Sequence, residues 1–520
     1  MSREGAGGDG EPGGSSVVCS ILESDPARAR AAIESAPVAC GWIELRAERL
    51  GDADALQLVS RYGNRLIFTL RPVNEAAPGE RSEEARARLF GRALETGAAW
   101  IDVEWGRPVA ALAEARHADR VILSHHAAHA DARRLGESYA AMRGSRAARL
   151  KIVAEAARPS DVLAVRPLLE RAARERRALA CFAQGRGGAS SRLLAPSWGS
   201  WATYGAATPG RESAPGQFTA RDLLEIYEVD AIGPSTRLHA LLGGSLSGSP
   251  SPAMHAAAYR AAGIDARYFP MELALSARRD APAEPGEPGE PDELDGLFEP
   301  GGLADQLGLG GFAVTMPFKR RVASLCRPAD GLAAAAGAVN TVVRARSGWL
   351  AYNTDGTAAL DLLGRRIDLD GAAVAVLGAG GTARSIAAAL APAGARVTLF
   401  GRDSARVSCA ADAVGAQPAS WRELSGAHWQ VLVNATPLGS RGERILPVEG
   451  LRGRVVLDAV YGPEPTPLVQ DARSRGLGVI SGFELLVAQA ALQFQRHVGQ
   501  AAERAVMSAA GTQWLSRRRP

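Results

Sequence analysis

The sequence SAPGQ at residues 213–217, followed by SGSPSP at residues 247–252, separates two different patterns in this 520-residue chain. Upstream, short apolar runs alternate with helical segments in one repeating unit. Downstream, another α/β pattern begins and leads into a glycine-rich, nucleotide-binding sequence. A chain of this length is too long for a single hydrophobic core. We therefore predict two α/β units joined near residues 232–236.

Composition excludes several classes of protein. Hydrophobic residues make up 46% and charged residues 22% of the chain, as in soluble globular proteins. No apolar run reaches the roughly 18 residues of a membrane span. The net charge is only +4 and no basic patch is interleaved with aromatics, so we expect neither nucleic acid nor membrane as a partner. Residues 1–16 are glycine-rich and lack the order of a signal peptide, so we predict a disordered N-terminus and a cytoplasmic location.

The lysines are the sharpest compositional signal. Of 60 basic residues, only Lys151 and Lys319 are lysines. Arginine stays protonated, whereas an amine can lose its proton and act as nucleophile or base. We expect both lysines to be catalytic; the alternative is that two surface lysines remain by chance.

The first half contains eight short β-prone runs separated by segments of helical period. They are 17–22, 42–47, 66–70, 100–104, 121–124, 150–154, 178–182 and 201–204. Eight strands alternating with helices predict a (β/α)8 TIM barrel over residues 17–232. A doubly wound open sheet is the alternative.

Polar residues that are unusual for a core follow or interrupt these runs. The first are Glu44, Arg46, Arg71 and Glu104, and further along are His125, His126, Lys151, Arg192, Ser213 and Gln217. Active sites of such barrels lie at the C-terminal ends of the strands. Together these residues predict a site with a carboxylate-binding arginine, a lysine nucleophile and a histidine acid/base, although each alone could be a structural ion pair.

The runs GWIELRAE, LRPVNE, ILSHH, LKIVA, SSRLLAPS and SAPGQ resemble type I 3-dehydroquinate dehydratase over the whole segment. The resemblance implies that Lys151 forms a Schiff base with the ketone of 3-dehydroquinate and that His126 moves the protons. It also implies that Arg192 binds the substrate carboxylate and that Glu75 orients the histidine. The remaining implied substrate contacts are Glu44, Arg46, Arg71, Ser213 and Gln217.

Two positions depart from the family pattern, since Ala127 follows the histidine and Ala76-Ala77 follow Glu75. A metal site at His125, His126 and His129 is a further alternative, but no carboxylate motif accompanies them and none of the five cysteines forms a CxxC pair. We expect no metal.

The second half begins with an α/β domain at residues 236–356. Residues 276–302 are rich in Pro, Glu and Gly, and we predict a disordered insertion there. A strand at 312–317 places Lys319 at the head of a helix, and the turns GAVNT (337–341) and NTDG (353–356) follow. An amine, an amide and a carboxylate on neighbouring turns suit proton transfer to a hydroxyl, although a capping Asp and an exposed Lys are the alternative.

The run AVAVLGAGGTA at 373–383 is an apolar strand entering G-x-G-x-x-A and then a helix. This context predicts a Rossmann dinucleotide-binding domain, with bounds 357–482. The next strand ends in GRDSAR at 401–406, where two arginines favour the 2′-phosphate of NADP and Asp403 favours NAD. We predict NADP, a C-terminal helix at 483–500 that packs back on the substrate domain, and a fraying tail at 501–520.

The motifs SGSPSPAMH, GFAVTMPFK, GAVNT, YNTDG, VLGAGGTARS, LVNATPLG, DAVYGPEPTPL and SGFELLVAQAALQF resemble shikimate dehydrogenase. The resemblance implies that Lys319 and Asp355 are the catalytic pair. It implies shikimate contacts at Ser249, Ser251, Thr315, Asn340, Tyr461 and Gln489. It implies cofactor contacts at Gly378, Gly380, Gly381, Arg402, Arg406, Thr436 and Gly482. Gly248 and Ala313 stand where the family usually has His and Asn, so preference among related ring acids could differ.

The two implied reactions are consecutive, because the product of the dehydratase is the substrate of the dehydrogenase. We therefore expect a bifunctional shikimate-pathway enzyme with small-molecule substrates, as a monomer or a homodimer. One alternative is a dehydratase fused to a quinate dehydrogenase that uses NAD. Others are a ligand-sensing regulator of the same domain make-up, or a chain with one inactive half.

Overall fold

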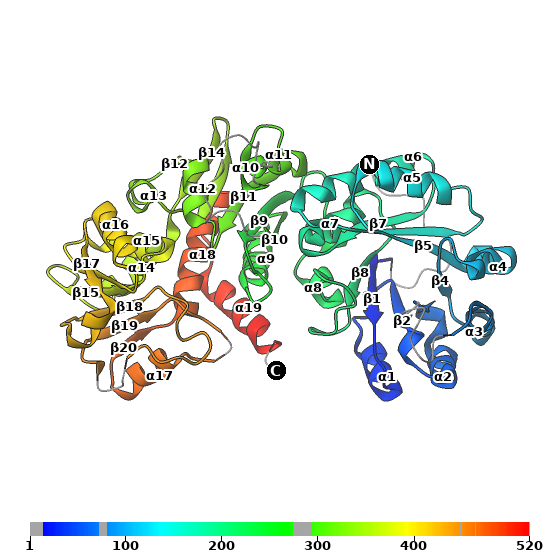
Figure 1. The fold of residues 1–520 in the computed structure, drawn as a ribbon, viewed down its shortest axis with the longest axis horizontal. Coiled ribbons are helices and arrows are strands. Elements are labelled where there is room, and N and C mark those ends of the chain that lie inside the picture. The colour runs from blue at the N-terminus through cyan, green and yellow to red at the C-terminus, as the bar shows by residue number, and fades with distance from the viewer. Residues whose placement is uncertain (1–13, 72–80, 274–292, 447–449, 463, 519–520) are drawn as a thin grey trace. The chain divides into compact units, whose positions relative to one another are not determined.

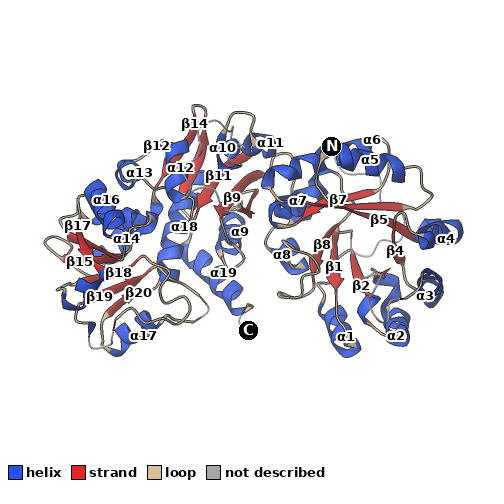
Figure 2. Ribbon diagram, viewed as in Figure 1, coloured by secondary structure: helices blue, strands red, loops and turns tan. Residues whose placement is uncertain are grey.

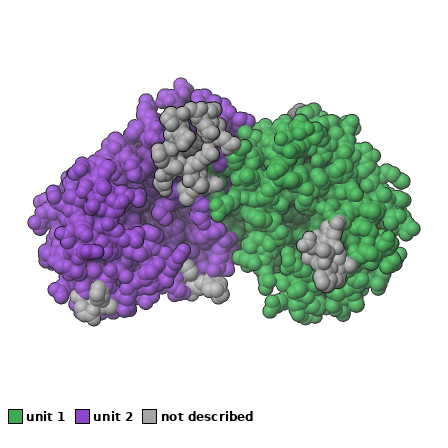
Figure 3. Space-filling model, viewed as in Figure 1, with its two compact units in different colours: residues 1–236, 271–274 green, residues 237–270, 275–520 purple. Residues whose placement is uncertain are grey.

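A computed structural model of the chain describes residues 14–71, 81–273, 293–446, 450–462 and 464–518. The chain divides into two compact units (Figure 3). Unit 1 contains residues 1–236 and 271–274, and unit 2 contains residues 237–270 and 275–520. No helix in the described ranges is long and apolar enough to cross a membrane.

The described residues of unit 1 form one parallel eight-stranded sheet that curls into a barrel, with its helices outside (Figures 1 and 2). The strands are β1 (Val17–Ile21), β2 (Trp42–Arg46), β3 (Leu66–Thr69), β4 (Trp100–Glu104), β5 (Val121–Ala127), β6 (Arg149–Glu155), β7 (Leu179–Gln184) and β8 (Thr203–Ala206). The helices are α1 (Pro26–Ser35), α2 (Asp52–Tyr62), α3 (Glu83–Thr96), α4 (Pro108–His117), α5 (Ala132–Met142), α6 (Val165–Arg174), α7 (Ala189–Leu194) and α8 (Ala220–Glu225).

The barrel prediction is confirmed by the strand order, β7-β6-β5-β4-β3-β2-β1-β8. β8 pairs in parallel with β1, so the last strand returns to the first. The remaining seam lies between β7 and β8, where the Trp201 N–H donates to the Leu179 carbonyl at 3.2 Å. The open-sheet alternative is therefore wrong.

The even-numbered strands pack the barrel interior in layers, because alternate side chains of a strand point to the same side. At the start of β2, β4 and β6 stand Trp42, Trp100 and Arg149. The Arg149 guanidinium carbon lies 4.3 Å from the Trp100 ring centroid and 4.6 Å from that of Trp201. This cation–π layer fills the N-terminal end of the barrel and leaves the next layers for chemistry.

The first sheet of unit 2 is mixed and, in its described residues, has the order β10-β9-β11-β13-β14-β12. Its strands are β9 (Arg237–Gly243), β10 (Ala266–Glu272), β11 (Leu309–Val314), β12 (Arg327–Pro328), β13 (Thr341–Ala345) and β14 (Gly348–Tyr352). Its helices are α9 (Ser251–Ala261), α10 (Glu293–Phe298), α11 (Leu303–Leu307), α12 (Lys319–Leu325) and α13 (Gly331–Ala336).

The second sheet of unit 2 is parallel, and its described strands have the order β17-β16-β15-β18-β19-β20. They are β15 (Ala373–Leu377), β16 (Arg396–Gly401), β17 (Gln417–Ser420), β18 (Val431–Asn434), β19 (Val455–Asp458) and β20 (Gly478–Ile480). The accompanying helices are α14 (Thr354–Gly364), α15 (Gly381–Leu390), α16 (Ser404–Val414), α17 (Pro467–Ser474), α18 (Gly482–Val498) and α19 (Arg504–Ser516). This order is that of a Rossmann fold, as predicted, with the switch point between β15 and β18.

The predicted disordered insertion at 276–302 extends too far. Residues 274–292 lie outside the described residues, but α10 and the turn after it are ordered. Leu294, Leu297 and Phe298 are buried, and the Phe298 ring packs edge-on against Phe312 at 5.2 Å between centroids. These three apolar side chains give the segment enough apolar surface to bury. The prediction missed them because the residues before them are rich in Pro, Glu and Gly.

The predicted fraying tail at 501–520 is also wrong for its described part. Residues 504–516 form α19, which packs against α9. Met507 is fully buried, and a Cβ added at Gly511 would lie 2.9 Å from the Phe483 ring. Met507, Gly511 and Trp514 recur at helical spacing, and this face attaches the helix to the domain.

Candidate active sites

A layer of charged side chains lies two residues beyond the Trp/Arg layer of the barrel. β2, β4 and β6 contribute Glu44, Asp102 and Lys151. The Lys151 Nζ lies 2.5 Å from Asp102 Oδ2 and 3.5 Å from Glu44 Oε1, and its side chain is 4% exposed. A buried ammonium needs such partners, because an unpaired charge in the interior is strongly destabilising. The geometry places one amine inside the barrel between two carboxylates.

The two carboxylates are held ionised by their surroundings. Burial alone would raise the pKa of Asp102, but the charges of Arg71 and Lys151 outweigh it and bring the pKa below the ordinary range. Arg71 Nη2 lies 3.0 Å from Asp102, and the Ser124 hydroxyl donates to it at 2.6 Å. Burial likewise opposes ionisation of Glu44, yet Lys151 and Arg46 lower its pKa. The lysine therefore sits in a negatively charged surrounding.

An aromatic face completes the environment of the lysine. The Lys151 Nζ lies 4.3 Å from the ring centroid of Tyr204 on β8, and the Tyr204 ring packs against Phe182 at 5.8 Å. The negative face of an aromatic ring attracts a cation, and it does so more strongly away from water. A positive charge at this nitrogen is thus stabilised from two sides.

His126 lies at the C-terminal end of β5, with Nδ1 3.8 Å from Glu104 Oε1. Burial and the Arg71 charge lower its pKa to about 4, while the contact with Glu104 opposes the shift. The imidazole is 35% exposed, so solvent should reduce the effect of burial. In either case the imidazole is neutral near pH 7 and able to accept a proton.

Arg192 on α7 is a buried cation, and the acidic residue whose charge acts on it, Glu155, forms no ion pair with it in the described part of the chain. It is 2% exposed, its Nη1 donates to the Tyr204 carbonyl at 3.3 Å, and its guanidinium lies 4.8 Å from the Phe182 ring centroid. Among the described residues, no carboxylate forms an ion pair with it and its Nε has no hydrogen-bond partner. Burial lowers its pKa to about 10. Such a group is suited to receive an anion from outside the chain.

Most of the predicted residues of the first half line one cavity of about 310 Å³, but His125 does not; its ring packs edge-on against Trp105, at 5.2 Å between centroids. The cavity lining includes Glu44, Arg46, Arg71, His126, Lys151, Arg192, Ser213 and Gln217. Gln217 Oε1 accepts hydrogen bonds from the Ser213 N–H at 2.7 Å and its hydroxyl at 3.1 Å. Arg46 pairs instead with Glu48 at 2.7 Å. Glu75 lies outside the described residues.

Sequence reasoning did not assign Asp102 or Tyr204 to this site. Asp102 is an acid inside an apolar strand, in the same position of β4 as Glu44 in β2. That shared position is a signal that the alternation of inward-facing residues could have revealed.

The second cavity lies in unit 2 and measures about 570 Å³. Its lining includes the predicted residues Ser249, Ser251, Thr315, Lys319, Asn340, Asp355, Thr436, Tyr461, Gly482 and Gln489. It also includes Thr382 and Gln493, which the sequence did not single out. Residues from both sheets therefore surround one cleft.

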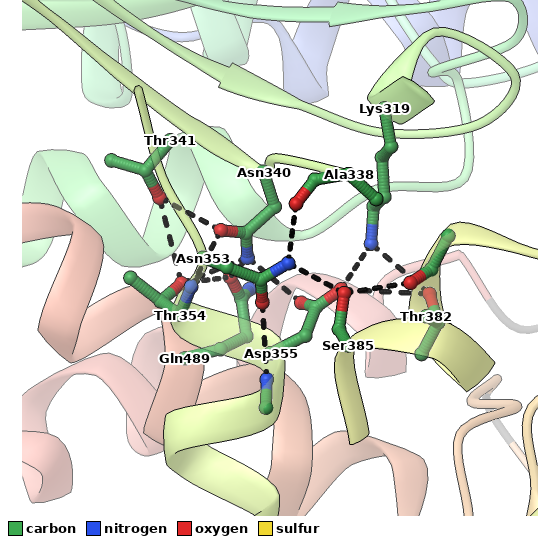
Figure 4. Close-up of polar contacts among 12 residues, drawn as sticks. Lys319, Ala338, Asn340, Thr341, Asn353, Thr354, Asp355, Thr382, Ser385 and Gln489 are labelled. Atoms are coloured by element: carbon green, nitrogen blue, oxygen red, sulfur yellow. Dashed lines mark hydrogen bonds and ion pairs between the residues drawn. The ribbon is translucent and has the colours of Figure 1, made fainter. Parts of the chain in front are cut away.

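At its centre, Lys319 at the start of α12 forms an ion pair with Asp355 Oδ2 (Figure 4). The other oxygen of Asp355 accepts from Asn340 Nδ2 at 2.8 Å. The same amide nitrogen lies 3.1 Å from Gln489 Oε1. The carboxylate is thus fixed on both oxygens, and the predicted amine, amide and carboxylate meet in one network.

The position of Asp355 follows from the cap of its helix. Asn353 is the N-cap of α14, and its side chain accepts the Gly356 N–H at 3.2 Å. The cap places Asp355 in the first turn, where the helix dipole favours a negative charge.

The glycine-rich turn runs from β15 to α15, next to β18. Gly378 has φ of +110°, and a Cβ there would lie 3.2 Å from Ala435 O. Gly380 is the N-cap of α15, and a Cβ there would meet nothing within 4 Å. The open space at this N-terminus fits a pyrophosphate, which backbone N–H groups and the helix dipole attract.

The residues after β16 bear on the choice of dinucleotide. The Asp403 carboxylate accepts the Arg406 N–H at 3.1 Å and caps α16, while the side chains of Arg402 and Arg406 are exposed. The acid is thus occupied by the helix and the two arginines are available for a 2′-phosphate. Gly378, Gly380, Gly381, Arg402 and Arg406 do not line the 570 Å³ cavity. They lie on the turns that follow β15 and β16 and at the starts of the next helices, α15 and α16.

Comparisons with known proteins agree with the division into two units. Residues 17–234 match the family model for type I 3-dehydroquinase, and residues 241–342 match the shikimate dehydrogenase substrate binding domain. A bifunctional 3-dehydroquinate dehydratase/shikimate dehydrogenase of Arabidopsis thaliana, named as chloroplastic, is 28% identical over 492 residues, covering 88% of this chain and 77% of that protein.

A shikimate dehydrogenase (NADP(+)) of Anaeromyxobacter sp. (strain Fw109-5) is 36% identical over 287 residues, covering 53% of this chain and 95% of that protein. A crystal structure of shikimate 5-dehydrogenase from Thermus thermophilus, in complex with NADP(H) and shikimate, is 29% identical. It covers 54% of this chain and 99% of that chain, with a TM-score of 0.45.

Proposed function

Because the chain belongs to the shikimate dehydrogenase family and carries a type I 3-dehydroquinase domain ahead of it, we propose that it catalyses two consecutive reactions. Unit 1 dehydrates 3-dehydroquinate to 3-dehydroshikimate. Unit 2 reduces 3-dehydroshikimate to shikimate with NADPH. The observation that carries this proposal is that each of the chain's two lysines lies in a cavity beside a carboxylate.

In unit 1, the Lys151 amine attacks the substrate ketone, and loss of water gives a protonated imine. This cation withdraws electrons from the adjacent carbon, so a neighbouring C–H becomes acidic. The neutral His126 takes that proton and later returns one to the leaving hydroxyl. The positive imine nitrogen would remain between Asp102 and Glu44 and over the Tyr204 ring, whose charges and face stabilise it.

Arg192 is the proposed binding group for the substrate carboxylate. Its guanidinium is desolvated and forms no ion pair among the described residues, so the hydrogen bonds to a carboxylate would not compete with an existing ion pair. Glu44, Arg46, Arg71, Ser213 and Gln217 are proposed to contact the ring substituents and Glu75 to orient His126.

In unit 2, NADP is the cofactor and, in its reduced form, supplies a hydride. Lys319 and Asp355 exchange the proton that must reach the ketone oxygen as the hydride arrives at its carbon. Ser249, Ser251, Thr315, Asn340, Tyr461 and Gln489 are proposed to hold the substrate. Gly378, Gly380 and Gly381 would receive the pyrophosphate, Arg402 and Arg406 the 2′-phosphate, and Thr436 and Gly482 the nicotinamide side of the cofactor.

The regulator alternative predicts lost catalytic groups, whereas Lys151, His126, Lys319 and Asp355 are present and line the two cavities. We propose a cytoplasmic enzyme, although the Arabidopsis relative is named as chloroplastic. A monomer or a homodimer remains our proposal for its assembly.

The test is to incubate the single purified chain with 3-dehydroquinate and NADPH. We expect one NADPH to be oxidised for each shikimate formed, with NADH much less effective. Accumulation of 3-dehydroshikimate without shikimate would contradict the assignment of unit 2. Faster turnover of quinate with NAD would favour the quinate dehydrogenase alternative.

A further inference from the structure

Lys319 has a second partner besides Asp355. Its Nζ donates to the Thr382 hydroxyl at 3.2 Å, and Thr382 Oγ1 lies 3.5 Å from Asp355 Oδ2 (Figure 4). Thr382 is the second residue of α15, the helix that follows the glycine-rich turn. A hydroxyl of the cofactor-binding segment thus contacts the catalytic pair directly.

The aliphatic stem of the same lysine also packs on this helix. A Cβ added at Gly381, the first residue of α15, would lie 3.1 Å from Lys319 Cβ and 3.4 Å from Lys319 Cδ. The stem therefore crosses the backbone at Gly381, and the ammonium reaches the next residue, Thr382. These two contacts define the course of the lysine side chain along the first turn of α15.

Asp355 is tied to α15 as well, through the cap of its own helix. Asn353 Nδ2 donates to the Ser385 hydroxyl of α15 and, at 2.7 Å, to the Ala338 carbonyl. The Ser385 hydroxyl in turn donates to Gly381 O at 2.6 Å. Lys319 and Asp355 are thus both held in position by contacts with the start of α15, Lys319 directly and Asp355 through Asn353.

We propose that Thr382 is a positioning residue that links the cofactor segment to the proton-transfer pair. This inference rests on the proposed NADPH-dependent reduction in unit 2. Its hydroxyl fixes the direction of the Lys319 ammonium, so that the pair is aligned with respect to the turn that binds the pyrophosphate. A lysine has several rotatable bonds, and one anchoring carboxylate leaves its ammonium free to swing. Proton transfer is sensitive to such displacement, because donor and acceptor must be within hydrogen-bond reach.

The test compares Thr382→Val, which keeps the branched shape and removes the hydroxyl, with Thr382→Ser, which keeps the hydroxyl. We expect Thr382→Val to lower the kcat for 3-dehydroshikimate reduction by about 10-fold, as for loss of one hydrogen bond to a charged group. The KM for 3-dehydroshikimate and the Kd for NADPH should change by less than about 3-fold, because neither ligand is held by this hydroxyl in the proposal. Thr382→Ser should restore most of the kcat.

Two controls separate this inference from the proposed function and from misfolding. Thr512→Val makes the same change at an exposed position of α19 and should leave both activities unchanged. The dehydratase activity of unit 1, measured on each sample, reports the amount of folded chain. An unchanged kcat in Thr382→Val, or an equal loss in Thr382→Ser, overturns the role of the hydroxyl. A wild-type chain that does not reduce 3-dehydroshikimate overturns the proposed function itself.

Discussion

The two lysines of this chain lie in contrasting surroundings. Lys151 is on a strand in the barrel interior, 4% exposed, between Asp102 and Glu44 and over the ring of Tyr204. Lys319 begins a helix beside an open cleft, is 12% exposed, and contacts one carboxylate and one hydroxyl. Both amines have an aspartate partner, but the remaining groups differ.

The difference corresponds to the chemistry proposed for each lysine. The imine that an amine forms with a ketone carries a positive charge, so a fixed negative and aromatic environment stabilises it. An amine that exchanges a proton with an alkoxide must be reached by substrate and cofactor, so its partners come from helix ends that line a cleft. Rigid strands suit imine formation at Lys151, and the cleft between two sheets suits proton exchange at Lys319. Four substitutions test this comparison, from the largest expected effect to the smallest.

Replacing Lys151 should have the largest effect. Lys151→Arg keeps a positive charge between the two carboxylates but removes the nucleophile, because guanidinium does not lose its proton at neutral pH. We expect dehydratase kcat to fall by at least ~10⁴-fold, since the covalent route is lost. Borohydride with 3-dehydroquinate should give a stable mass adduct on the wild-type peptide containing residue 151 and none on the variant.

The dehydrogenase activity of the same sample serves as the folding control for Lys151→Arg. It should be unchanged, since Lys151 belongs to unit 1. A variant that retains dehydratase activity, or is still trapped by borohydride, would show that Lys151 is a structural ion-pair partner.

Asp355→Asn tests the cleft in the same way with a smaller expected loss. The side chain keeps its shape and can keep a contact with Asn340, but Lys319 loses its anionic partner. We expect dehydrogenase kcat to fall by about 10²- to 10³-fold, the usual range for removing a group that takes part in proton transfer. Stopped-flow measurement of NADPH oxidation gives the rate of the reduction step.

The matched control is Asp361→Asn, further along α14, where the carboxylate pairs with Arg365 and Arg504 on the surface. Its kcat should stay within about 2-fold of wild type, because exposed ion pairs contribute little. Equal losses in the two variants would mean that charge on α14, and not the pair with Lys319, determines the rate.

Arg192→Met separates binding from stability in the barrel. We expect the KM for 3-dehydroquinate to rise by about 10²-fold, because a desolvated, charge-assisted contact to the substrate carboxylate is lost. The thermal stability of unit 1 should not fall, because the substitution removes a buried charge that forms no ion pair among the described residues. Calorimetry and steady-state kinetics measure the two effects.

The exposed Arg133, paired with Glu137 on α5, supplies the control for Arg192→Met. Arg133→Met should change neither KM nor melting temperature by much. A large loss of stability in Arg192→Met alone would show that this arginine holds the fold together, and would contradict its assignment to the substrate.

The barrel and the Rossmann domain could be predicted from the sequence because their signals are local. Alternating short apolar runs and helical segments fix the strands, and the turn after Leu377 marks the nucleotide site. The two lysines stand out by composition alone. Glu75 and the roles assigned to the other site residues stay predictions.

What sequence reasoning missed depends on contacts between distant segments. Asp102 is 49 residues from Lys151 in the sequence. The sequence around Asp102 would look the same if this residue were an ordinary buried acid with a structural role. Thr382 belongs to a glycine-rich motif that is usually explained by the contact of its backbone with the cofactor, so its side chain was not considered. Its contact with Lys319 joins residues 63 positions apart in the sequence. The face of α19 is only partly apolar, so its packing on α9 shows only when both helices are in place.

The smallest expected effect concerns acid stability, where the two units also differ. His239 and His255 of unit 2 are buried, and His497 is half-buried with both ring nitrogens enclosed. Their rings lie near one another, with those of His239 and His497 stacked at 4.7 Å between centroids. Burial lowers the pKa of His255 to about 3 and that of His497 to about 4, and it brings that of His239 well below its usual value. Near pH 7 all three are neutral in the folded and unfolded states. As the pH falls through about 6.5, the unfolded chain binds protons that the folded chain refuses, so stability present above pH 6.5 is lost toward pH 4.

We therefore expect heat to inactivate the dehydrogenase more readily at pH 5 than at pH 7. The dehydratase of the same chain should change less, because the described part of unit 1 has only two histidines with lowered pKa values, His125 and His126, and neither is buried. The buried ion pairs of unit 1 involve carboxylates whose pKa values lie lower. His255→Phe keeps a ring stacked on Tyr268 and removes one of the three proton-binding groups, so it should reduce the pH dependence of the inactivation temperature by about a third, or a few degrees. Equal acid sensitivity of the two activities, or an unchanged slope in His255→Phe, would show that these buried imidazoles do not set the difference between the units.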